Sequence, residues 1–376
     1  MYAYAGYPVF LFLLGFVKRK QRHKDSAFEP TVSLVIAAYN EAANIGEKLE
    51  NSLALNYPAE KLEILVVSDC STDETDQIVE NFRHTGIMLH RMPLRGGKTV
   101  AQNDAVQQCN NEIIIFSDAN AIYHPDAVRK IVQNFADHRV GCVCGELKYV
   151  NDMESIVGQE ENLYWKYEKT LKRLEDSVGT ILGANGSIYA IRKELYVPLP
   201  PDTISDLIEP LKIVYNGSQL VYEPEAISVE ATCESFKDEF RRKKRIVLRS
   251  LHSLFKNRSL LNVFRFPMLA FQLISHKIIR WFVPVILSGV FLGNLFLISK
   301  PFYLIVFILQ CVFYLLALIG YRLMTKNTRC RVLYIPLYFC MVNLASLIAI
   351  IRFFQGKSVA FWQPARNVCS QQHEIS

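Results

Sequence analysis

The sequence lacks the features of a zinc protein or a nucleic-acid-binding protein. Among its nine cysteines, Cys142 and Cys144 make a C-x-C, but no second cysteine pair or histidine partner follows at a finger-like distance. We therefore interpret the cysteines as buried thiols in a reducing compartment. The net charge is only +6 over 376 residues, so the sequence gives no general attraction to nucleic acid and we expect no such partner.

Basic residues are also missing before the first apolar segment. Residues 2–17 are mostly apolar, and a run of lysines and arginines follows them at 18–24. A cleaved secretory signal carries its positive charge before the apolar run rather than after it. The sequence therefore predicts an uncleaved transmembrane anchor over residues 1–17, and the positive-inside rule places the chain that follows in the cytoplasm.

Long apolar runs are concentrated in the C-terminal third. Hydrophobic residues make up 51% of the chain, and its mean hydropathy is +0.13. A helix needs about 20 apolar residues to cross a bilayer. Region 281–354 contains three runs near that length, and we expect about three spans there, at 281–299, 302–320 and 333–354.

The residues flanking these runs bear on membrane orientation. Segment 264–280 is apolar with basic residues near its end, which suits a helix lying along the membrane surface. Counting spans places the tail at 355–376 outside the cytoplasm. Its neighbours Arg352, Lys357 and Arg366 favour the inside, so the side of the tail stays open.

Residues 18–263 have the pattern of an α/β domain. Apolar runs of strand length alternate with helix-like stretches. We expect strands at 32–38, 63–67, 86–90 and 112–116, with helices at 41–55, 71–83, 99–108 and from 124 onward. The S-x-x-E spacing of Ser71 and Glu74 predicts a capping box at the start of the second helix. This alternation predicts a mostly parallel sheet with helices on both faces.

Polar residues follow three of the expected strands. Asn40, Asp69 and Asp118 each lie just beyond a strand end. Asparagine and aspartate are common turn residues, so each position alone has an ordinary structural explanation. In open α/β sheets, however, ligands bind beyond the carboxyl ends of the strands. Together the three residues predict one binding crevice.

Six short motifs occur in order between about residues 31 and 251: Ala38-Tyr39-Asn40-Glu41, Ser68-Asp69-Cys70-Ser71-Thr72-Asp73, Gly96-Gly97-Lys98, Ser117-Asp118-Ala119-Asn120, Gly183-Ala184-Asn185-Gly186-Ser187, and Asp206. This order resembles family 2 glycosyltransferases, the membrane-bound group that includes synthases of cellulose, hyaluronan and poly-N-acetylglucosamine. The resemblance implies a GT-A fold, an α/β nucleotide-sugar domain, and a nucleotide-sugar donor that we expect to be UDP-linked.

The resemblance also implies roles for individual residues. Asp206 matches the general base of the family. The acceptor-site residues would be Asn185, Gly186 and Trp165, although a core or interfacial position is the alternative for Trp165. The nucleotide-binding residues would be Ala37, Tyr39, Glu41, Asp69, Lys98, Asp118 and Ala119.

Two departures from the family pattern affect the cofactor and the product. The second metal-binding aspartate is replaced by Asn120, whose neutral oxygen still suits Mg²⁺ or Mn²⁺ but holds it less strongly than a carboxylate. We expect Asp118 and Asn120 to bind that metal. The Q-x-x-R-W motif of processive synthases is absent, and 242–246 keeps only its arginine. Processivity therefore stays open.

The chemistry of the resemblance needs one base and a stabilised leaving group. A single carboxylate that takes the acceptor proton, followed by direct displacement, inverts the anomeric configuration. Arg242 and Arg245 could hold the departing diphosphate beside the metal, since with Arg249 they share one helix face. The alternative for this face is contact with anionic lipid. A hydrolase-like carboxylate pair of Asp206 and Glu209 is the weaker interpretation.

These observations predict an integral protein of the plasma or inner membrane, with its catalytic domain in the cytoplasm. We expect an inverting glycosyltransferase that extends a glycan in extracellular or envelope polysaccharide synthesis. Two alternatives stay open: transfer of one sugar to a lipid-linked acceptor, and a catalytically silent nucleotide-binding subunit of a synthase complex. Expected partners are the donor, the acceptor and the bilayer, together with a possible second copy of the chain or an export partner.

Overall fold

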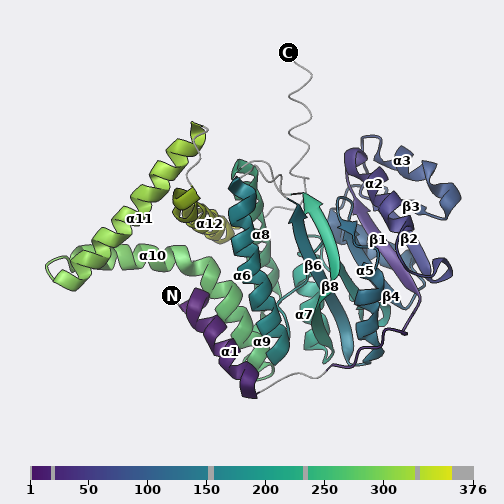
Figure 1. The fold of residues 1–376 in the computed structure, drawn as a ribbon, viewed down its shortest axis with the longest axis horizontal. Helices are drawn as coiled ribbons and strands as arrows, with labels where there is room; N and C mark the ends of the chain where they lie inside the picture. Colours follow the sequence, from purple (N-terminus) through teal and green to yellow (C-terminus); the bar gives the residue numbers. More distant parts are fainter. Residues whose placement is uncertain (1, 18–21, 151–155, 232–235, 327–330, 358–376) are drawn as a thin grey trace, which may run out of the picture.

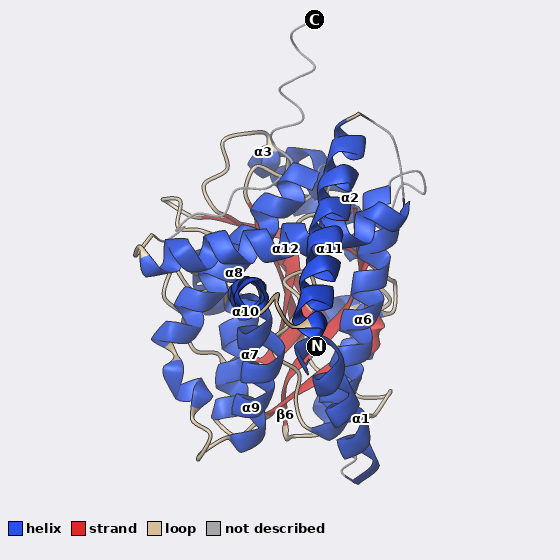
Figure 2. Cartoon of the chain, turned by 90° about the vertical axis from the view of Figure 1, so that its left-hand side faces the viewer, coloured by secondary structure: helices blue, strands red, loops and turns tan. Residues whose placement is uncertain are grey.

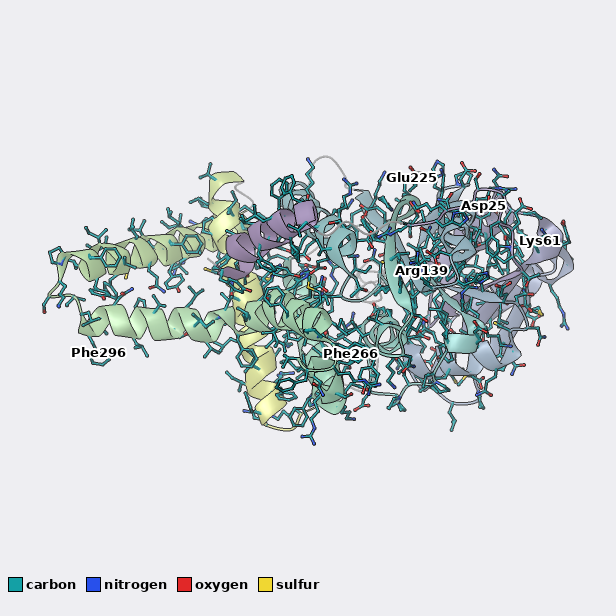
Figure 3. All side chains as sticks on the ribbon, turned by 90° about the horizontal axis from the view of Figure 1, so that it is seen from below. Asp25, Lys61, Arg139, Glu225, Phe266 and Phe296 are labelled. Atoms are coloured by element: carbon teal, nitrogen blue, oxygen red, sulfur yellow. The ribbon has the colours of Figure 1, made fainter. Side chains whose placement is uncertain are left out.

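The computed structural model describes residues 2–17, 22–150, 156–231, 236–326 and 331–357. An α/β domain forms one end of the molecule, and apolar helices form the other (Figure 1). Lys61 lies at the sheet end and Phe296 at the tip of the helical end (Figure 3). The tail, including Arg366, lies outside the described residues.

One sheet of eight strands organises the α/β domain, in the order β3-β2-β1-β4-β7-β6-β8-β5. The first four strands in this order are parallel and confirm the expected strands. They are β3 (Met88–Arg91), β2 (Leu62–Ser68), β1 (Val32–Ala38) and β4 (Ile113–Asp118). The others are β7 (Tyr189–Arg192), β6 (Val140–Val150), β8 (Gln219–Ala231) and β5 (Ile122–Tyr123).

The sheet is mixed: four of its seven strand pairings are parallel, and β7 pairs antiparallel with both β4 and β6. Tyr189, at the start of β7, pairs with Phe116 near the carboxyl end of β4. The loop before β7 therefore lies at the sheet edge that carries Asp118. Reversal of this one strand brings segment 183–187 to the expected crevice.

Alternate residues of β1 face two separate hydrophobic cores. Leu34 and Ile36 contact the core beneath α2 (Ala42–Leu53), α3 (Thr75–Asn81) and α5 (Ala127–Val132). Val35 and Ala37 face the core beneath α4 (Lys98–Gln108) and α7 (Ser205–Tyr215). This period of two is the side-chain alternation of a strand, and burial on both faces explains its continuous apolar sequence.

The predicted capping box is wrong. Helix α3 begins at Thr75 rather than after Ser71, and no side chain caps it. Cys70 has a left-handed backbone (φ 61°), which turns Ser71 toward the loop after β1. There the Ser71 hydroxyl accepts a hydrogen bond from the backbone N–H of Asn40 at 3.2 Å. A tertiary contact thus takes the hydroxyl that the local pattern assigned to the helix.

Two long helices stand between the sheet and the apolar helices: α6 (Ile156–Val178) and α8 (Phe236–Lys256) (Figure 1). The N-terminal segment forms a π-helical turn (Tyr2–Gly6) and α1 (Tyr7–Val17). One face of α1 packs on α6, where Tyr7 and Leu11 contact Leu171 and Val178. Its opposite face exposes large apolar side chains, as a membrane-contacting helix would.

Three described helices are long and apolar enough to cross a bilayer, at Pro267–Phe296, Pro301–Thr325 and Val332–Phe354. The first contains α9 (Pro267–Gln272), a π-helical turn (Leu273–Ile278) and α10 (Ile279–Phe296). The expected surface helix at 264–280 and the span after it are therefore one helical run, with no break at 280. The others are α11 (Pro301–Thr325) and α12 (Arg331–Phe354).

Helix α12 differs from α10 and α11 in direction and burial. It runs across them and lies along α8, whereas α10 and α11 extend outward as a hairpin (Figures 2 and 3). Within the protein, 56% of its most apolar window is buried, against 11% and 6% for the other two. Helix α12 thus packs on the domain, and the hairpin exposes its apolar surface.

Candidate active site

The loops after β1 and β2 hold the first predicted site residues. Asn40 and Cys70 are the described non-glycine residues with positive φ, at 50° and 61°. Such a backbone costs energy and persists only where its surroundings fix it. The Asn40 side-chain oxygen accepts the backbone N–H of Thr72 at 2.8 Å, which ties the two loops together. The paired loops form one rim of the crevice.

Asp69 anchors the glycine loop that precedes Lys98. Its buried carboxylate accepts hydrogen bonds from the backbone N–H groups of Gly96 (2.7 Å) and Gly97 (2.8 Å). Burial raises the pKa of Asp69, although these two bonds favour its charged form and oppose the rise. Besides its predicted contact with the nucleotide, Asp69 therefore positions the glycine loop.

Arg95 belongs to the same loop and was not anticipated from the sequence. Its guanidinium lies 3.8 Å from the centre of the Tyr39 ring, a cation–π contact. The glycine-lysine motif beside Arg95 was the available signal for it. Because Tyr39 is a predicted nucleotide-binding residue, Arg95 adds a positive charge next to that position.

Lys98 begins α4 and joins two parts of the site. Its ammonium group forms an ion pair with Asp118 at the end of β4 and donates to the carbonyl oxygen of Gly186 at 3.3 Å. Burial lowers the pKa of Lys98, but the nearby carboxylates of Asp118 and Asp206 outweigh that effect and raise it. Lys98 is thus a fixed positive charge at the centre of the crevice.

Gly186 marks the point where three predicted site residues meet. A Cβ atom added there would lie 2.8 Å from the Lys98 Nζ, 3.0 Å from an Asp206 oxygen and 3.4 Å from an Asp118 oxygen. Asp206 is in the first turn of α7, and its backbone oxygen accepts the N–H of Ala184 at 2.7 Å. Loop 183–187 and α7 therefore hold each other in place.

Asp206 has the electrostatic setting of a base. Burial raises the pKa of its carboxyl, Lys98 lowers it and Asp118 raises it again. A carboxylate with an elevated pKa accepts a proton more readily than an exposed one.

Glu209 does not share that setting, which removes the hydrolase-like carboxylate pair. It is buried outside the cavity that contains Asp206, and the Tyr189 hydroxyl donates to it at 3.0 Å. Burial raises the pKa of Glu209 to about 8. Glu209 lies three positions after Asp206 on α7, and its side chain therefore points into the protein core rather than into the cavity.

The structure describes two of the three predicted acceptor-site residues, Asn185 and Gly186. Asn185 donates to the Gly145 carbonyl at 2.9 Å and accepts from the Lys172 ammonium at 2.9 Å. These bonds fix its side chain at the cavity wall. Trp165 falls within α6, but its side chain lies outside the described part of the structure, so its predicted role stays a prediction.

The site opens into a cavity of about 500 Å³. Nine of the predicted residues line it: Glu41, Lys98, Asp118, Asn120, Asn185, Gly186, Asp206, Arg242 and Arg245. Four others lie outside this lining: Ala37, Tyr39, Asp69 and Ala119. Most of the predicted residues therefore lie around one cavity, whereas part of the expected nucleotide set lies outside its lining.

The basic face of α8 points into this cavity, as its spacing predicted. Arg242 pairs with the buried carboxylate of Glu239 at 2.6 Å, and Lys243 lies 3.4 Å from the same carboxylate. Arg245 and Arg249 line the cavity as well. The alternative role for this face, contact with lipid head groups, does not fit the part that is turned inward.

The oxygen donors fit a hard divalent cation that is shared with a ligand. Asp118 and Asn120 both line the cavity, and their carboxylate and amide oxygens are ligand types of Mg²⁺ and Mn²⁺. Among the residues described here, no group of three or more histidine, cysteine or acidic side chains could hold a metal alone. Such a cation would need further ligands besides these two side chains.

Several cavity residues were missed from the sequence. Lys172, Glu230, Lys277 and Arg280 line it from α6, β8 and the helical run Pro267–Phe296. They belong to no short motif and are far apart along the chain. Only Arg249 had a signal, because it continues the spacing of Arg242 and Arg245.

Comparison with known proteins agrees with this geometry. Residues 33–196 match the family described as Glycosyl transferase family 2. A probable glycosyltransferase, YdaM of Bacillus subtilis, is 28% identical over 256 residues, covering 60% of this chain and 58% of that protein. Poly-beta-1,6-N-acetyl-D-glucosamine synthase of Staphylococcus aureus is 27% identical over 203 residues, covering 52% of this chain and 48% of the synthase. The match thus spans about half the length of these relatives.

A solved structure resembles the whole fold. The mannosyltransferase PcManGT of Pyrobaculum calidifontis, solved in complex with GDP-Man and Mn²⁺, aligns with a TM-score of 0.70 at 22% identity. The alignment covers 95% of this chain and 97% of that one. This similarity confirms the predicted GT-A fold.

Proposed function

Since residues 33–196 are a glycosyl transferase family 2 domain, we propose that the protein is a membrane-anchored inverting glycosyltransferase with a UDP-sugar donor. The meeting of Lys98, Asp118 and Asp206 around Gly186 carries the proposal. It places a candidate base beside the residues that the donor diphosphate would need.

The proposed reaction is one displacement at the anomeric carbon. An acceptor hydroxyl oxygen attacks that carbon, and its proton passes to a carboxylate oxygen of Asp206. The bond to the diphosphate breaks as the new bond forms, and the nucleoside diphosphate leaves with the electron pair. Attack from the face opposite the leaving group inverts the configuration.

Charge on the departing diphosphate requires cations. Asp118 and Asn120 would hold Mg²⁺ or Mn²⁺, which supplies Lewis-acid stabilisation of the diphosphate when bound. Lys98 adds a fixed charge, and Arg242 and Arg245 reach the same cavity from α8. Glu239 compensates part of the charge of Arg242, and Arg245 lines the same cavity from the next turn of α8.

We propose that the α10–α11 hairpin crosses the membrane and that α12 lies near its surface. The exposed apolar surface of the hairpin and the packing of α12 along α8 support this arrangement. Helix α12 contributes Val342 and Ser346 to the cavity. The catalytic domain would then rest on the cytoplasmic face, with its acceptor end toward the lipid.

Two products are compatible with this site. Similarity to a polysaccharide synthase supports extension of a glycan. The cavity that the apolar helices help to line supports transfer of one sugar to a lipid-linked acceptor. Product length separates them, since a polymer or ladder indicates repeated transfer and a single increment indicates one. The assembled base and cations argue against a catalytically silent subunit.

The first experiment is nucleotide release by protein held in nanodiscs, across UDP- and GDP-sugars with Mg²⁺ or Mn²⁺. We expect release with one donor, and a loss of about 10²- to 10⁴-fold in Asp206→Asn, which keeps the shape but not the basicity. UDP binding should survive in that variant. Undiminished turnover in Asp206→Asn would remove this residue from the base position.

A further inference from the structure

Three basic side chains line the catalytic cavity without an ion-pair partner among the described residues. Lys172 comes from α6, Arg249 from α8 and Lys277 from the helical run Pro267–Phe296. The Lys172 ammonium bonds the neutral oxygen of Asn185, and Arg249 donates to the carbonyl of Thr203 at 2.9 Å. The Nε of Arg249 is buried and unbonded.

The other charges around them are largely matched. Lys98 pairs with Asp118, Arg280 lies 2.6 Å from Glu168, and Arg242 shares Glu239 with Lys243. His276 contacts both Glu168 and Glu175. Carboxylates also act on two of the three cations: Glu168 and Glu175 on Lys277, and Asp206 and Asp202 on Arg249. Eight basic and five acidic side chains line the cavity, so its lining still has an excess of positive charge. Such charge is costly unless an anion compensates it.

The three cations and the nucleotide loops belong to different elements of the fold. The nucleotide end is defined by the loops of Tyr39 and Asp69, at the carboxyl ends of β1 and β2. The three cations come instead from α6, α8 and the helical run Pro267–Phe296, and α6 and α8 lie between the sheet and the apolar helices (Figure 1). Charges on Arg249 and Lys277 both act on the Asp206 carboxyl, so they are close to the reacting centre.

Apolar and aromatic side chains also line this cavity. Tyr4, Trp281 and Val342 line it from the N-terminal segment, the helical run Pro267–Phe296 and α12. All three belong to the elements that carry the membrane-contacting surface. One cavity therefore contains the candidate base, the three cations and side chains of the apolar helices.

We propose that Lys172, Arg249 and Lys277 form a phosphate subsite for the acceptor, which is a sugar joined through phosphate to an apolar chain. The inference rests on the proposed function and names its acceptor class. The reactive hydroxyl lies at Asp206, the phosphate lies among the three cations, and the apolar chain leaves between the membrane helices. No step of the displacement changes, because the phosphate is only bound.

The test measures binding rather than turnover, so it stands apart from the proposed reaction. Full-length protein in phosphatidylcholine nanodiscs is saturated with UDP and Mg²⁺, then titrated with farnesyl phosphate or with farnesol as the neutral control. We expect the phosphate to bind at least about tenfold more tightly than the alcohol, since only the phosphate forms charged hydrogen bonds with the three cations.

The variants assign that difference to named side chains. Lys277→Gln and Arg249→Gln should each weaken farnesyl phosphate binding by about tenfold or more, Lys277→Arg should restore most of it, and UDP affinity should not change. Lys326→Gln, at the exposed end of α11, is the matched control and should bind like wild type. Folding of the variants is checked by their UDP affinity.

Two results would overturn the proposal. Equal binding of farnesyl phosphate and farnesol would show that no phosphate subsite exists. Loss of UDP affinity in Lys277→Gln, with farnesyl phosphate binding intact, would assign the cations to the donor diphosphate. Inorganic phosphate and glucose 1-phosphate form a further arm: binding as tight as that of farnesyl phosphate would overturn the lipid part of the acceptor, and weaker binding would support it.

Discussion

The carbonyl oxygen of Gly186 accepts a hydrogen bond from Lys98, and the missing side chain of Gly186 leaves the space that Lys98 and Asp206 occupy. Lys98 begins a helix on one face of the sheet, and Gly186 precedes an antiparallel strand far along the chain. This contact links the glycine-lysine motif to the loop expected at the acceptor site. The cluster of Lys98, Asp118 and Asp206 therefore has room only when position 186 is a glycine.

Replacing Gly186 should therefore disturb catalysis. In Gly186→Ala the new Cβ would lie 2.8 Å from the Lys98 Nζ and 3.0 Å from Asp206, so both side chains must shift. We expect sugar transfer to fall by about tenfold or more, because small misplacements at a reacting centre are costly. Gly46→Ala is the control, since its nearest neighbour would be 3.8 Å away in a helix. Equal activities of the two variants would contradict this account.

Asp69 should affect both nucleotide binding and stability. Asp69→Ala removes the acceptor of two backbone hydrogen bonds and leaves the Gly96 and Gly97 N–H groups unbonded. We expect a loss of about 2–4 kcal/mol in the free energy of unfolding and weaker UDP binding. Thermal unfolding and UDP titration measure the two effects. A wild-type UDP affinity in this variant would exclude Asp69 from the nucleotide site.

The substitution at position 120 should tune the metal requirement. Asn120→Asp adds a charged oxygen ligand beside Asp118, which should lower the Mg²⁺ or Mn²⁺ concentration needed for half-maximal nucleotide release. Asn120→Ala removes the oxygen and should raise that concentration. Metal titrations of the purified variants provide the measurement, and an unchanged midpoint in both would remove Asn120 from the metal site.

Glu209 should make stability depend on pH. Its pKa is raised from 4.5 to about 8, so the folded protein keeps a proton that the unfolded chain releases at lower pH. Stability should fall as pH rises from about 4.5 to about 8, by up to about 5 kcal/mol for this group, and then level off. Melting temperatures across that range should decline less in Glu209→Gln. Parallel curves for both proteins would refute the assignment.

The arrangement of α12 predicts the side of the C-terminus. If only the α10–α11 hairpin crosses the bilayer, a tag in its turn at 297–300 and a tag at the C-terminus should lie on opposite sides. Protease accessibility in sealed vesicles of known orientation measures this, with the catalytic domain as the internal reference. Three spans would instead place both tags on one side.

The identity of the α/β domain could be predicted from local sequence. The continuous apolar run of β1 and the alternation of strands with helices gave the four parallel strands, because both patterns depend on the burial of neighbouring residues. The capping box failed because Ser71 bonds to a loop about 30 residues away, which no local pattern encodes. The antiparallel pairing of β7 was not predicted either, because it depends on β4 and β6, which are distant from β7 in the sequence.

Sequence alone predicted the candidate site residues Lys98, Asp118, Gly186 and Asp206, because they stand in motifs that occur in order, and the structure brings them together. Tertiary structure decided which charges surround that centre. Lys172, Arg249 and Lys277 lie on three helices separated by dozens of residues, and only packing brings them into one cavity. Tertiary structure also decided that Glu209 is buried and that α12 lies along α8, because burial and helix direction depend on contacts between distant segments.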